Sequence, residues 1–321
     1  MKSIKVGQSG LYASELGLGT INFGTELDES ASFAIMDRAA ELGITHIDTA
    51  DVYPSPESPE IWGLTEEIVG RWLKGRRDDF VVATKAVNRV GPGANDAGGS
   101  RKHLLAACER SLRRLGTDYV DIFYLHRPDM LDAPLEETLG AVDKIVQDGK
   151  ALYIGLSNFS TWQVALVLEA IAASRLAPVT VLQDRYNLVS RRNERDLYPL
   201  AAAKGLGLFA YNPLAAGMLA GLFKRGAALP GEGRFTTSIY QDRYFREDVY
   251  DAIDVAQATA DELGVPVAQL ALAWILQQGF GVSPIVGALR PEHLSDSVKA
   301  LDLVLPPEVM ERLNGASTRF S

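Results

Sequence analysis

Short apolar runs alternate with longer amphipathic stretches along almost the whole chain. The runs are rich in β-branched and aromatic residues, as strands are, whereas the stretches between them repeat apolar residues at the spacing of a surface helix. Strands that alternate with helices are typical of βα units and a parallel sheet. The expected strands are Glu15–Gly19, Thr45–Thr49, Phe80–Lys85, Val120–His126, Ala151–Ser157, Thr180–Asp184, Leu206–Tyr211 and Val282–Val286.

The amphipathic stretches predict helices. Asp28 can cap the first of them, and Gly149 follows the end of another, where glycine is common. Two further helices, Asp248–Leu263 and Val267–Gln277, precede the last strand. The remaining expected helices are Thr65–Leu73, Arg101–Leu115, Leu135–Asp148, Thr161–Ser174, Leu197–Lys204 and Pro291–Ala300.

This order of elements predicts an α/β fold, a (β/α)8 TIM barrel that forms a single domain over residues 1–321. Such barrels need about 250 residues, and insertions lengthen them. We expect an N-terminal β-hairpin from Ser3–Val6 and Tyr12–Ser14, and extra helices around the last strand. A doubly wound sheet is less favoured, because the first βα turn, GLGTINFG, lacks the spacing G-x-G-x-x-G.

Three irregular segments interrupt the alternation, namely Val52–Gly63, Asn88–Gly99 and Pro213–Arg246. They are rich in Pro, Gly or Ser, and each follows an expected strand. Loops that follow the strands of a barrel lie at one rim, where long loops commonly hold ligands. We therefore expect a ligand site there.

Composition narrows the function classes. The formal net charge is −9, which argues against a nucleic-acid partner, since such proteins carry basic patches. A single cysteine, Cys108, permits no disulfide within the chain and fits a reducing compartment. The N-terminus lacks the apolar core of a signal peptide, and no run reaches the roughly 18 apolar residues of a membrane span. We expect a cytoplasmic protein with small-molecule partners and no membrane association.

Four polar residues at or just after successive strands carry the candidate chemistry: Asp48, Tyr53, Lys85 and His126. A free Tyr is a poor acid at neutral pH, but a nearby ammonium favours the phenolate and lowers the Tyr pKa. Asp48 would hold Lys85 charged, and Tyr53 would protonate a carbonyl oxygen. His126 would donate a second hydrogen bond to that oxygen.

Each of these residues also has an ordinary structural explanation. A Lys at a strand end is commonly solvated, and a single His there is commonly a hydrogen-bonded structural residue. An Asp after a strand often caps a turn. Only the joint placement after consecutive strands favours hydride transfer to a carbonyl. The hydride would come from a cofactor, because no side chain supplies one.

Motifs spread over the whole length resemble the aldo-keto reductase family, in that family's order. They are GLGTINFG, GITHIDTADVY, GLTEEIVGRWL, VVATK, SLRRLGTDYVDIFYLHRPD, GKALYIGLSNFS, VLQDRYNL, YNPLAAGMLAG and IVGALRPEHL. The resemblance implies a (β/α)8 barrel with NADPH extended across its C-terminal rim. It also implies that Asp48, Tyr53, Lys85 and His126 form the catalytic tetrad. The Pro-rich loop after Tyr53 is similar to a bacterial branch of NADP-dependent oxidoreductases.

The resemblance further implies cofactor contacts. Ser157, Asn158 and Gln183 would hydrogen-bond the nicotinamide carboxamide, and Tyr211 would stack on its ring. The other implied cofactor-binding residues are Gly19, Thr20 and Asp48 near the nicotinamide, Asn212, Pro213, Leu214, Gly217 and Leu219 over the pyrophosphate, and Arg234, Gly287, Leu289, Arg290, His293 and Ser297 toward the adenosine.

Some positions depart from the family's pattern. His293 stands where the family often has Gln, Ser297 where it often has Asn, and Leu222 where a basic residue is common. The resemblance implies NADPH as the preferred cofactor, and these departures leave NADH open. The substrate pocket would be lined by Asn22, Phe23, Trp62 and Arg127, with Trp62 equally interpretable as a loop anchor.

Two other function classes compete with the enzyme. Barrels of this family also serve as NADPH-binding regulatory subunits with slow turnover. A metal-dependent hydrolase would need clustered ligands, whereas the four histidines occur in scattered contexts. We expect no metal site.

Overall fold

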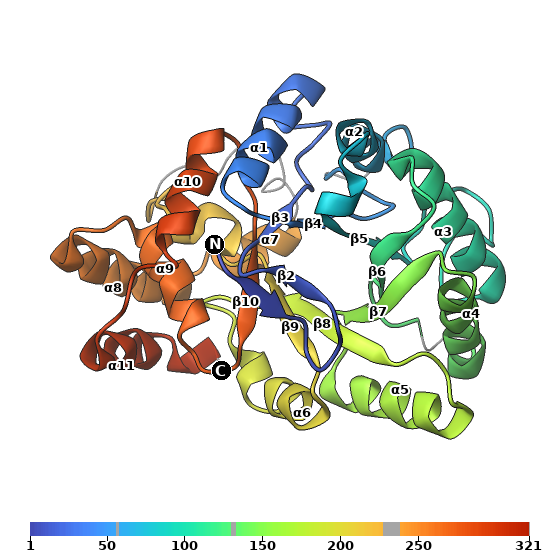
Figure 1. Ribbon diagram of the computed structural model, residues 1–321. Coiled ribbons are helices and arrows are strands. Elements are labelled where there is room, and N and C mark those ends of the chain that lie inside the picture. Colours follow the sequence, from blue (N-terminus) through green and yellow to red (C-terminus); the bar gives the residue numbers. More distant parts are fainter. Residues whose placement is uncertain (56–57, 130–132, 227–237, 321) are drawn as a thin grey trace.

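The computed structural model describes residues 1–55, 58–129, 133–226 and 238–320. Its centre is a closed barrel in which each strand pairs in parallel with the next and the last pairs with the first (Figure 1). The barrel strands are β3 (Gly17–Gly19), β4 (His46–Asp48), β5 (Val81–Ala86), β6 (Val120–Leu125), β7 (Ala151–Ser157), β8 (Val179–Arg185), β9 (Gly207–Tyr211) and β10 (Val282–Val286). The predicted (β/α)8 barrel is confirmed.

Helices surround this barrel and cover its outer surface (Figure 1). They are α1 (Glu29–Glu41), α2 (Leu64–Leu73), α3 (Arg101–Leu115), α4 (Leu135–Gln147), α5 (Thr161–Ser174), α6 (Leu197–Lys204), α7 (Ser238–Tyr244), α8 (Glu247–Leu263), α9 (Val267–Leu276), α10 (Pro291–Lys299) and α11 (Pro307–Ala316). Short 3-10 turns lie at Arg77–Asp79, Arg192–Glu194, Ala215–Ala220 and Thr318–Phe320. The α7 and α11 helices were not among those expected from the pattern.

Side chains at the helix ends explain several of the boundaries. The Asp28 carboxylate accepts the backbone N–H of Ala31 at 2.8 Å and caps α1 as expected. Ser160 and Gln163 form a reciprocal capping box at the start of α5. Gly149 follows the end of α4 with a φ of 71°, a conformation that favours glycine. Of the helices in the described parts of the chain, none has the length and apolarity needed to cross a membrane.

The hairpin of β1 (Ser3–Lys5) and β2 (Tyr12–Ser14) lies across one end of the barrel (Figure 1). Val6 and Ala13 pack there onto side chains that fill the barrel interior, among them Phe209 and Ile285. This plug closes the N-terminal end. The carboxyl ends of the strands therefore form the open rim, which is where barrels of this type carry their chemistry.

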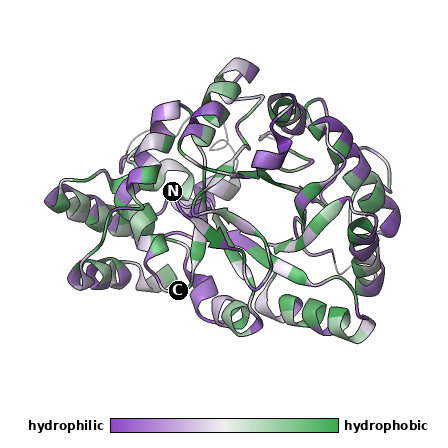
Figure 2. Ribbon diagram, in the orientation of Figure 1, coloured by the Kyte–Doolittle hydropathy of each residue, from purple (hydrophilic) through white to green (hydrophobic). Residues whose placement is uncertain are grey.

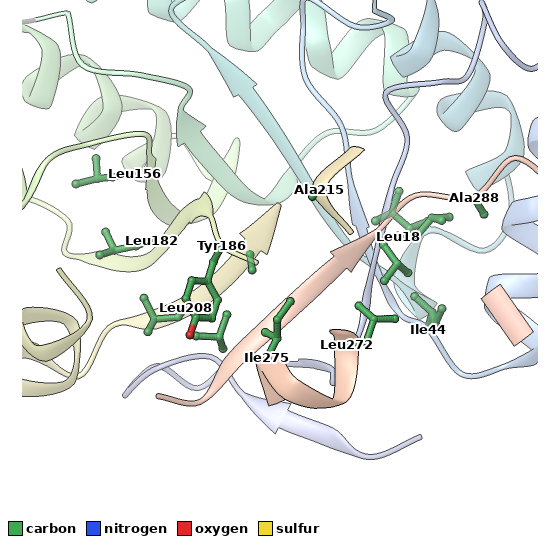
Figure 3. Packing of buried hydrophobic residues seen from close by; sticks show 14 of the residues in the cluster. Leu18, Ile44, Leu156, Leu182, Tyr186, Leu208, Ala215, Leu272, Ile275 and Ala288 are labelled. Atoms are coloured by element: carbon green, nitrogen blue, oxygen red, sulfur yellow. The ribbon is translucent and has the colours of Figure 1, made fainter. Parts of the chain in front are cut away.

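A second, larger core lies between the barrel and its outer helices. Figure 3 shows how Leu208 of β9 and Leu272 and Ile275 of α9 meet with other buried side chains in this layer. The outer helices place hydrophobic and hydrophilic residues side by side along their length (Figure 2), as helices packed on one face do. This packing holds the strand ends in fixed relative positions.

Candidate active site at the C-terminal rim

The four candidate residues converge on the open rim. Asp48 is the last residue of β4, Lys85 is the next-to-last of β5, and His126 directly follows β6. Tyr53 lies in the turn after β4, where its carbonyl accepts the backbone N–H of Gly63 at 3.0 Å. Because β4, β5 and β6 are consecutive neighbours in the barrel, their side chains share one small region.

A buried ion pair stands at the centre of this region. Lys85 has no solvent exposure, and its Nζ donates to Asp48 Oδ2 at 2.6 Å and to the Thr49 carbonyl at 2.8 Å. Gln183 Nε2 donates to the other carboxylate oxygen, Oδ1, at 2.7 Å. Thr20 donates to the backbone carbonyl of Asp48 through both its N–H and its hydroxyl, so the backbone of Asp48 is held as well as its carboxylate.

Burial lowers the pKa of Lys85, and the Asp48 carboxylate opposes that shift. Two further buried carboxylates, Asp51 and Glu66, add to the opposition. An unpaired ammonium at this depth would lose its proton at neutral pH. The paired geometry therefore favours a charged Lys85.

Tyr53 lies against both the ammonium and the imidazole. Its ring centroid is 5.2 Å from Lys85 Nζ and 5.9 Å from the centroid of the His126 ring, with the two rings 77° apart. Tyr53 is only partly buried, as expected of a residue in a turn at the rim. This is the arrangement that the sequence predicts for a Tyr activated by a neighbouring cation.

His126 is held in one orientation by Asn88, a residue that the sequence interpretation did not single out. Asn88 Nδ2 lies 3.2 Å from His126 Nδ1. With the amide nitrogen as donor, Nδ1 accepts, and the imidazole proton resides on Nε2. Burial, together with the positive charges of Lys85 and Arg127, holds the pKa of His126 well below its usual value. His126 is thus a neutral donor at physiological pH.

The backbone between Lys85 and Asn88 is strained. Val87 has a φ of 109°, in the region that a β-branched residue rarely adopts. The Val87 carbonyl accepts the N–H of Gly98 at 2.8 Å, which holds the turn in this conformation. Strain of this kind costs of order 1–3 kcal/mol and clusters at functional sites. Here it directs Asn88 toward His126.

The ends of β7, β8 and β9 supply a second polar group. Asn158 Nδ2 donates to the His126 carbonyl and to Ser157 Oγ, both at 3.0 Å. Tyr211 donates from its hydroxyl to Asn158 Oδ1 at 2.8 Å. The side chain of Asn158 therefore links the Tyr211 hydroxyl to the backbone of His126 in the tetrad. Asn158 itself has a φ of 63°. The structure brings these residues together with Gln183, as the sequence predicts.

The loop after β9 is also held in rare backbone conformations. Asn212, Ala215 and Ala216 have φ values of 57°, 49° and 57°, and Gly217 has a φ of 103°. Asn212 stabilises the loop, since its Oδ1 accepts the N–H of Ala216 at 2.5 Å and its Nδ2 donates to Tyr244 of α7 at 2.6 Å. A run of left-handed residues brings backbone close to a ligand, as in loops that cover phosphates. Pro213, Leu214 and Leu219 belong to the same loop, and Leu219 is fully buried.

The start of α10 carries the expected adenosine-end residues. The Arg290 guanidinium donates to His293 Nε2 at 3.1 Å, and Gly287 and Leu289 are exposed beside them. Ser297 is buried, and its hydroxyl donates to the His293 carbonyl at 2.8 Å. Its side chain is therefore occupied within the helix. Arg234 lies outside the described residues.

The four residues expected to line a substrate pocket have different surroundings. Phe23 is fully buried in the outer core. Asn22 is nearly buried beside it. Arg127 borders a cavity of about 10 Å³, large enough only for one water. Trp62 borders a groove beside α2 and α3, and the next residue, Gly63, donates its N–H to the Tyr53 carbonyl. The pattern of polar and apolar residues in the sequence does not indicate which way these loop side chains point.

The polar groups present at the rim suit the cofactor that the sequence implies. Amide and hydroxyl groups of Ser157, Asn158 and Gln183 offer both donors and acceptors, as a carboxamide requires. The strained loop and the α10 N-terminus suit phosphates. In the described parts of the chain, no group of three or more His, Cys, Asp or Glu residues is arranged to hold a metal ion.

Comparison with known proteins bears on the whole chain. The model of the Aldo/keto reductase family matches residues 15–318. A probable voltage-gated potassium channel subunit beta from Arabidopsis thaliana is 36% identical, with 98% of this chain and 95% of that protein aligned. The L-glyceraldehyde 3-phosphate reductase of Escherichia coli strain K12 is 36% identical over 92% of this chain and 86% of its own length. The uncharacterized oxidoreductase YrpG of Bacillus subtilis is 34% identical over 98% and 95%.

Proposed function

The chain belongs to the aldo/keto reductase family and is an NAD(P)-dependent oxidoreductase, and from this premise we propose that it reduces aldehydes or ketones with NADPH. The reverse reaction, oxidation of the corresponding alcohol, is part of the same proposal. The observation that carries it is the fully buried Lys85–Asp48 pair beside Tyr53. A buried ammonium next to a phenol favours the phenolate and so lowers the pKa of that phenol.

Tyr53 acts as the general acid in this proposal. The Lys85 ammonium favours the phenolate that remains when Tyr53 Oη gives its proton to the carbonyl oxygen. NADPH, when bound, supplies the hydride that reaches the carbonyl carbon. Asp48 keeps Lys85 charged while the phenolate exists, and the Gln183 and Thr20 contacts keep Asp48 in place.

His126 orients the substrate. The contact of Asn88 with Nδ1 places the imidazole proton on Nε2. In this proposal the Nε2–H donates a hydrogen bond to the carbonyl oxygen of the substrate. Such preorganised donors stabilise the charge that develops in the transition state. Because the His126 pKa lies well below 6.5, the ring does not compete with Tyr53 as the proton source at neutral pH.

The proposed cofactor contacts divide between two sides of the rim. Ser157, Asn158 and Gln183 would hold the carboxamide, Tyr211 would stack on the nicotinamide, and the loop from Asn212 to Leu219 would cover the pyrophosphate. Arg290, placed at the start of α10 by its bond to His293, supports NADPH over NADH, because a cation at a helix N-terminus suits a 2′-phosphate.

The direct test is the loss of NADPH absorbance by the purified protein with a panel of aldehydes, ketones and phosphorylated sugars, run in parallel with NADH. We expect turnover that is faster with NADPH. Tight cofactor binding without turnover on any carbonyl, at pH values from 5 to 9, would contradict the proposed reaction. Equal rates with NADH would contradict only the assignment of Arg290.

A second candidate function is that of a cofactor-binding regulatory subunit. It is favoured by the names of relatives from Arabidopsis thaliana and from Oryza sativa, which are both called probable voltage-gated potassium channel subunit beta. The complete set of Asp48, Tyr53, Lys85 and His126 favours the enzyme. Co-purification with a partner protein, together with turnover that stays slow on every carbonyl, would support the regulatory function.

We also propose that the protein works in the cytoplasm on small-molecule substrates. The single cysteine, Cys108, is buried, and burial raises its thiol pKa to about 12. A thiol in this state is a poor nucleophile and suits a packing role in a reducing compartment. Fractionation of cells that express the tagged protein tests the location.

A further inference from the structure

A groove on the outer side of the barrel, between α2 and α3, gathers arginines that the proposed reaction does not use. We call it the α2–α3 groove. Its space is about 480 Å³, which falls in the size range of small-molecule sites. The residues that line it are Trp62, Glu67, Arg71, Arg110, Arg113 and Arg114. Four guanidinium groups thus face one concavity in a chain whose net charge is −9.

Two of these arginines already have carboxylate partners. Arg114 binds the buried Glu66 through Nε at 2.7 Å, and that carboxylate also accepts the Thr84 hydroxyl at 2.5 Å. Arg71 forms a bidentate pair with Glu29 at 2.7 and 3.1 Å, with Glu67 3.8 Å away. These contacts fix the two guanidinium groups as walls of the groove.

The other two arginines have no such partner. Within the described chain, no ion pair or hydrogen bond to another residue engages the guanidinium of Arg110 or of Arg113. Like charges at this spacing on a helix repel one another, and the neighbouring carboxylate of α3, Glu109, is already paired with Lys150. A bound anion would offset that repulsion.

The groove also contains hydrogen-bond donors that lack acceptors. Trp62 Nε1 and one terminal nitrogen of Arg110, Nη2, are both shielded from solvent and have no partner in the described structure. A buried donor without an acceptor is unfavourable. Trp62 and Arg110 both line the groove, so an acceptor bound there would supply a hydrogen-bond partner next to them.

We propose that the α2–α3 groove binds a small molecule through a phosphate group. Arg110 and Arg113 provide charge-assisted hydrogen bonds to the phosphate oxygens, since a guanidinium matches phosphate geometry. The indole of Trp62 forms a flat wall for the rest of the ligand and donates its N–H to it. The observations behind this site are independent of the proposed carbonyl reduction.

This groove is distinct from the proposed cofactor site. The cofactor residues come from β7, β8, β9 and α10, whereas the groove residues come from α2, α3 and the residue Trp62 before α2. Figure 1 shows α2 and α3 on one side of the barrel and α10 on the other. A phosphate that binds the groove should therefore not displace NADP+.

The test is a titration with inorganic phosphate of protein loaded with one equivalent of NADP+, at constant ionic strength maintained with chloride. Calorimetry and tryptophan emission are followed together. We expect saturable binding and a spectral shift that disappears in Trp62→Phe while the heat of binding remains. In the R110A/R113A variant the dissociation constant should rise at least ~10-fold, as expected when charge-assisted bonds are lost.

A matched control removes two positive charges elsewhere. The K144A/R312A variant loses surface cations that pair with Asp148 and Glu262, and it should bind phosphate as the parent does. Equal binding by R110A/R113A and K144A/R312A would overturn the proposal. An equal response to acetate would overturn the phosphate class. Arg113→Gln, at an exposed position, repeats the test if the double variant does not fold. Failure of NADP+ to bind would affect the proposed function only.

Discussion

At the scale of the residue, the phenol of Tyr53 is the group whose removal tests the chemistry most directly. Tyr53→Phe keeps the ring that packs 5.9 Å from His126 and removes only the hydroxyl group. We expect turnover to fall at least ~10²-fold, the usual scale for the loss of a general acid. Cofactor affinity, measured by fluorescence titration, should be unchanged. Turnover equal to that of the parent would rule out Tyr53 as the proton donor.

Asn88 should matter through the tautomer of His126. Asn88→Leu removes the donor to Nδ1 and allows the imidazole proton to reside on the wrong nitrogen. Because one hydrogen bond contributes about 1 kcal/mol, we expect kcat/KM to fall by roughly fivefold, with the free energy of unfolding lowered by no more than about 1 kcal/mol. The matched variant Asn88→Gln keeps an amide and should retain more activity. Equal losses in both variants would indicate that Asn88 acts only by packing.

The buried imidazole of His46 should make the free energy of unfolding depend on pH. The ring is fully buried against Phe209, neither nitrogen has a hydrogen-bond partner among the described residues, and burial lowers its pKa to about 4 from 6.5. Between these two values the unfolded chain binds the extra proton and the folded chain does not, so stability falls as the pH falls from 6.5 to 4. The loss at pH 4 is about 3 kcal/mol from this residue. Urea unfolding of His46→Phe at pH 7 and pH 4 should show a smaller difference than the parent shows.

At the scale of the element, α2 and α3 touch backbone to backbone at Gly70. A Cβ added there would lie 2.3 Å from the Arg114 carbonyl oxygen and 2.7 Å from the backbone of Leu115. Gly70→Ala should therefore lower the free energy of unfolding by about 1–3 kcal/mol, the cost of overpacking, despite the better helix propensity of Ala. The control is Gly315→Ala in α11, where a Cβ meets no atom within 4 Å. That variant should be neutral or more stable by up to about 1 kcal/mol in the same urea titration.

The same elements show why sequence patterns located most of the fold. The barrel strands fall within about two residues of the expected runs, because a strand buried on both faces reads as a continuous apolar run. The α7 helix went unrecognised because it lies in a Gly-rich irregular segment. The α11 helix begins with Pro307 after Pro306, a pair that reads as a loop although Pro is well accepted in a first helical turn.

The candidate site was predictable only in part, for a related reason. A polar residue at a strand end must lie on the rim, so Asp48, Lys85 and His126 could be placed from periodicity alone. Loop side chains have no such rule. Phe23 lies in the outer core, and Trp62 lies in the α2–α3 groove. Asn88 gave no signal, since its role depends on the positive φ of Val87, which no pattern of polarity encodes.

At the scale of the whole molecule, the proposed cofactor site crosses the place where the barrel closes. The nicotinamide residues stand on β7, β8 and β9, whereas Arg290 stands after β10, which pairs with β9 on one side and with β3 on the other. The β3–β10 pairing joins only Gly17 and Leu18 to Ile285 and Val286. A ligand that contacts residues on both sides of β9 and β10 would therefore reinforce the closure of the barrel.

This arrangement predicts that NADP+ stabilises the folded protein. A ligand that binds only the folded state at a hundred times its dissociation constant adds about 2.7 kcal/mol, so the melting temperature should rise by several degrees in differential scanning calorimetry. NAD+ at the same concentration should raise it less, because it lacks the phosphate that Arg290 would bind. Arg290→Ala should reduce the NADP+ effect toward that of NAD+ and leave the NAD+ effect unchanged. A loss of both effects would mean that Arg290 holds the start of α10, through His293, and does not read the phosphate.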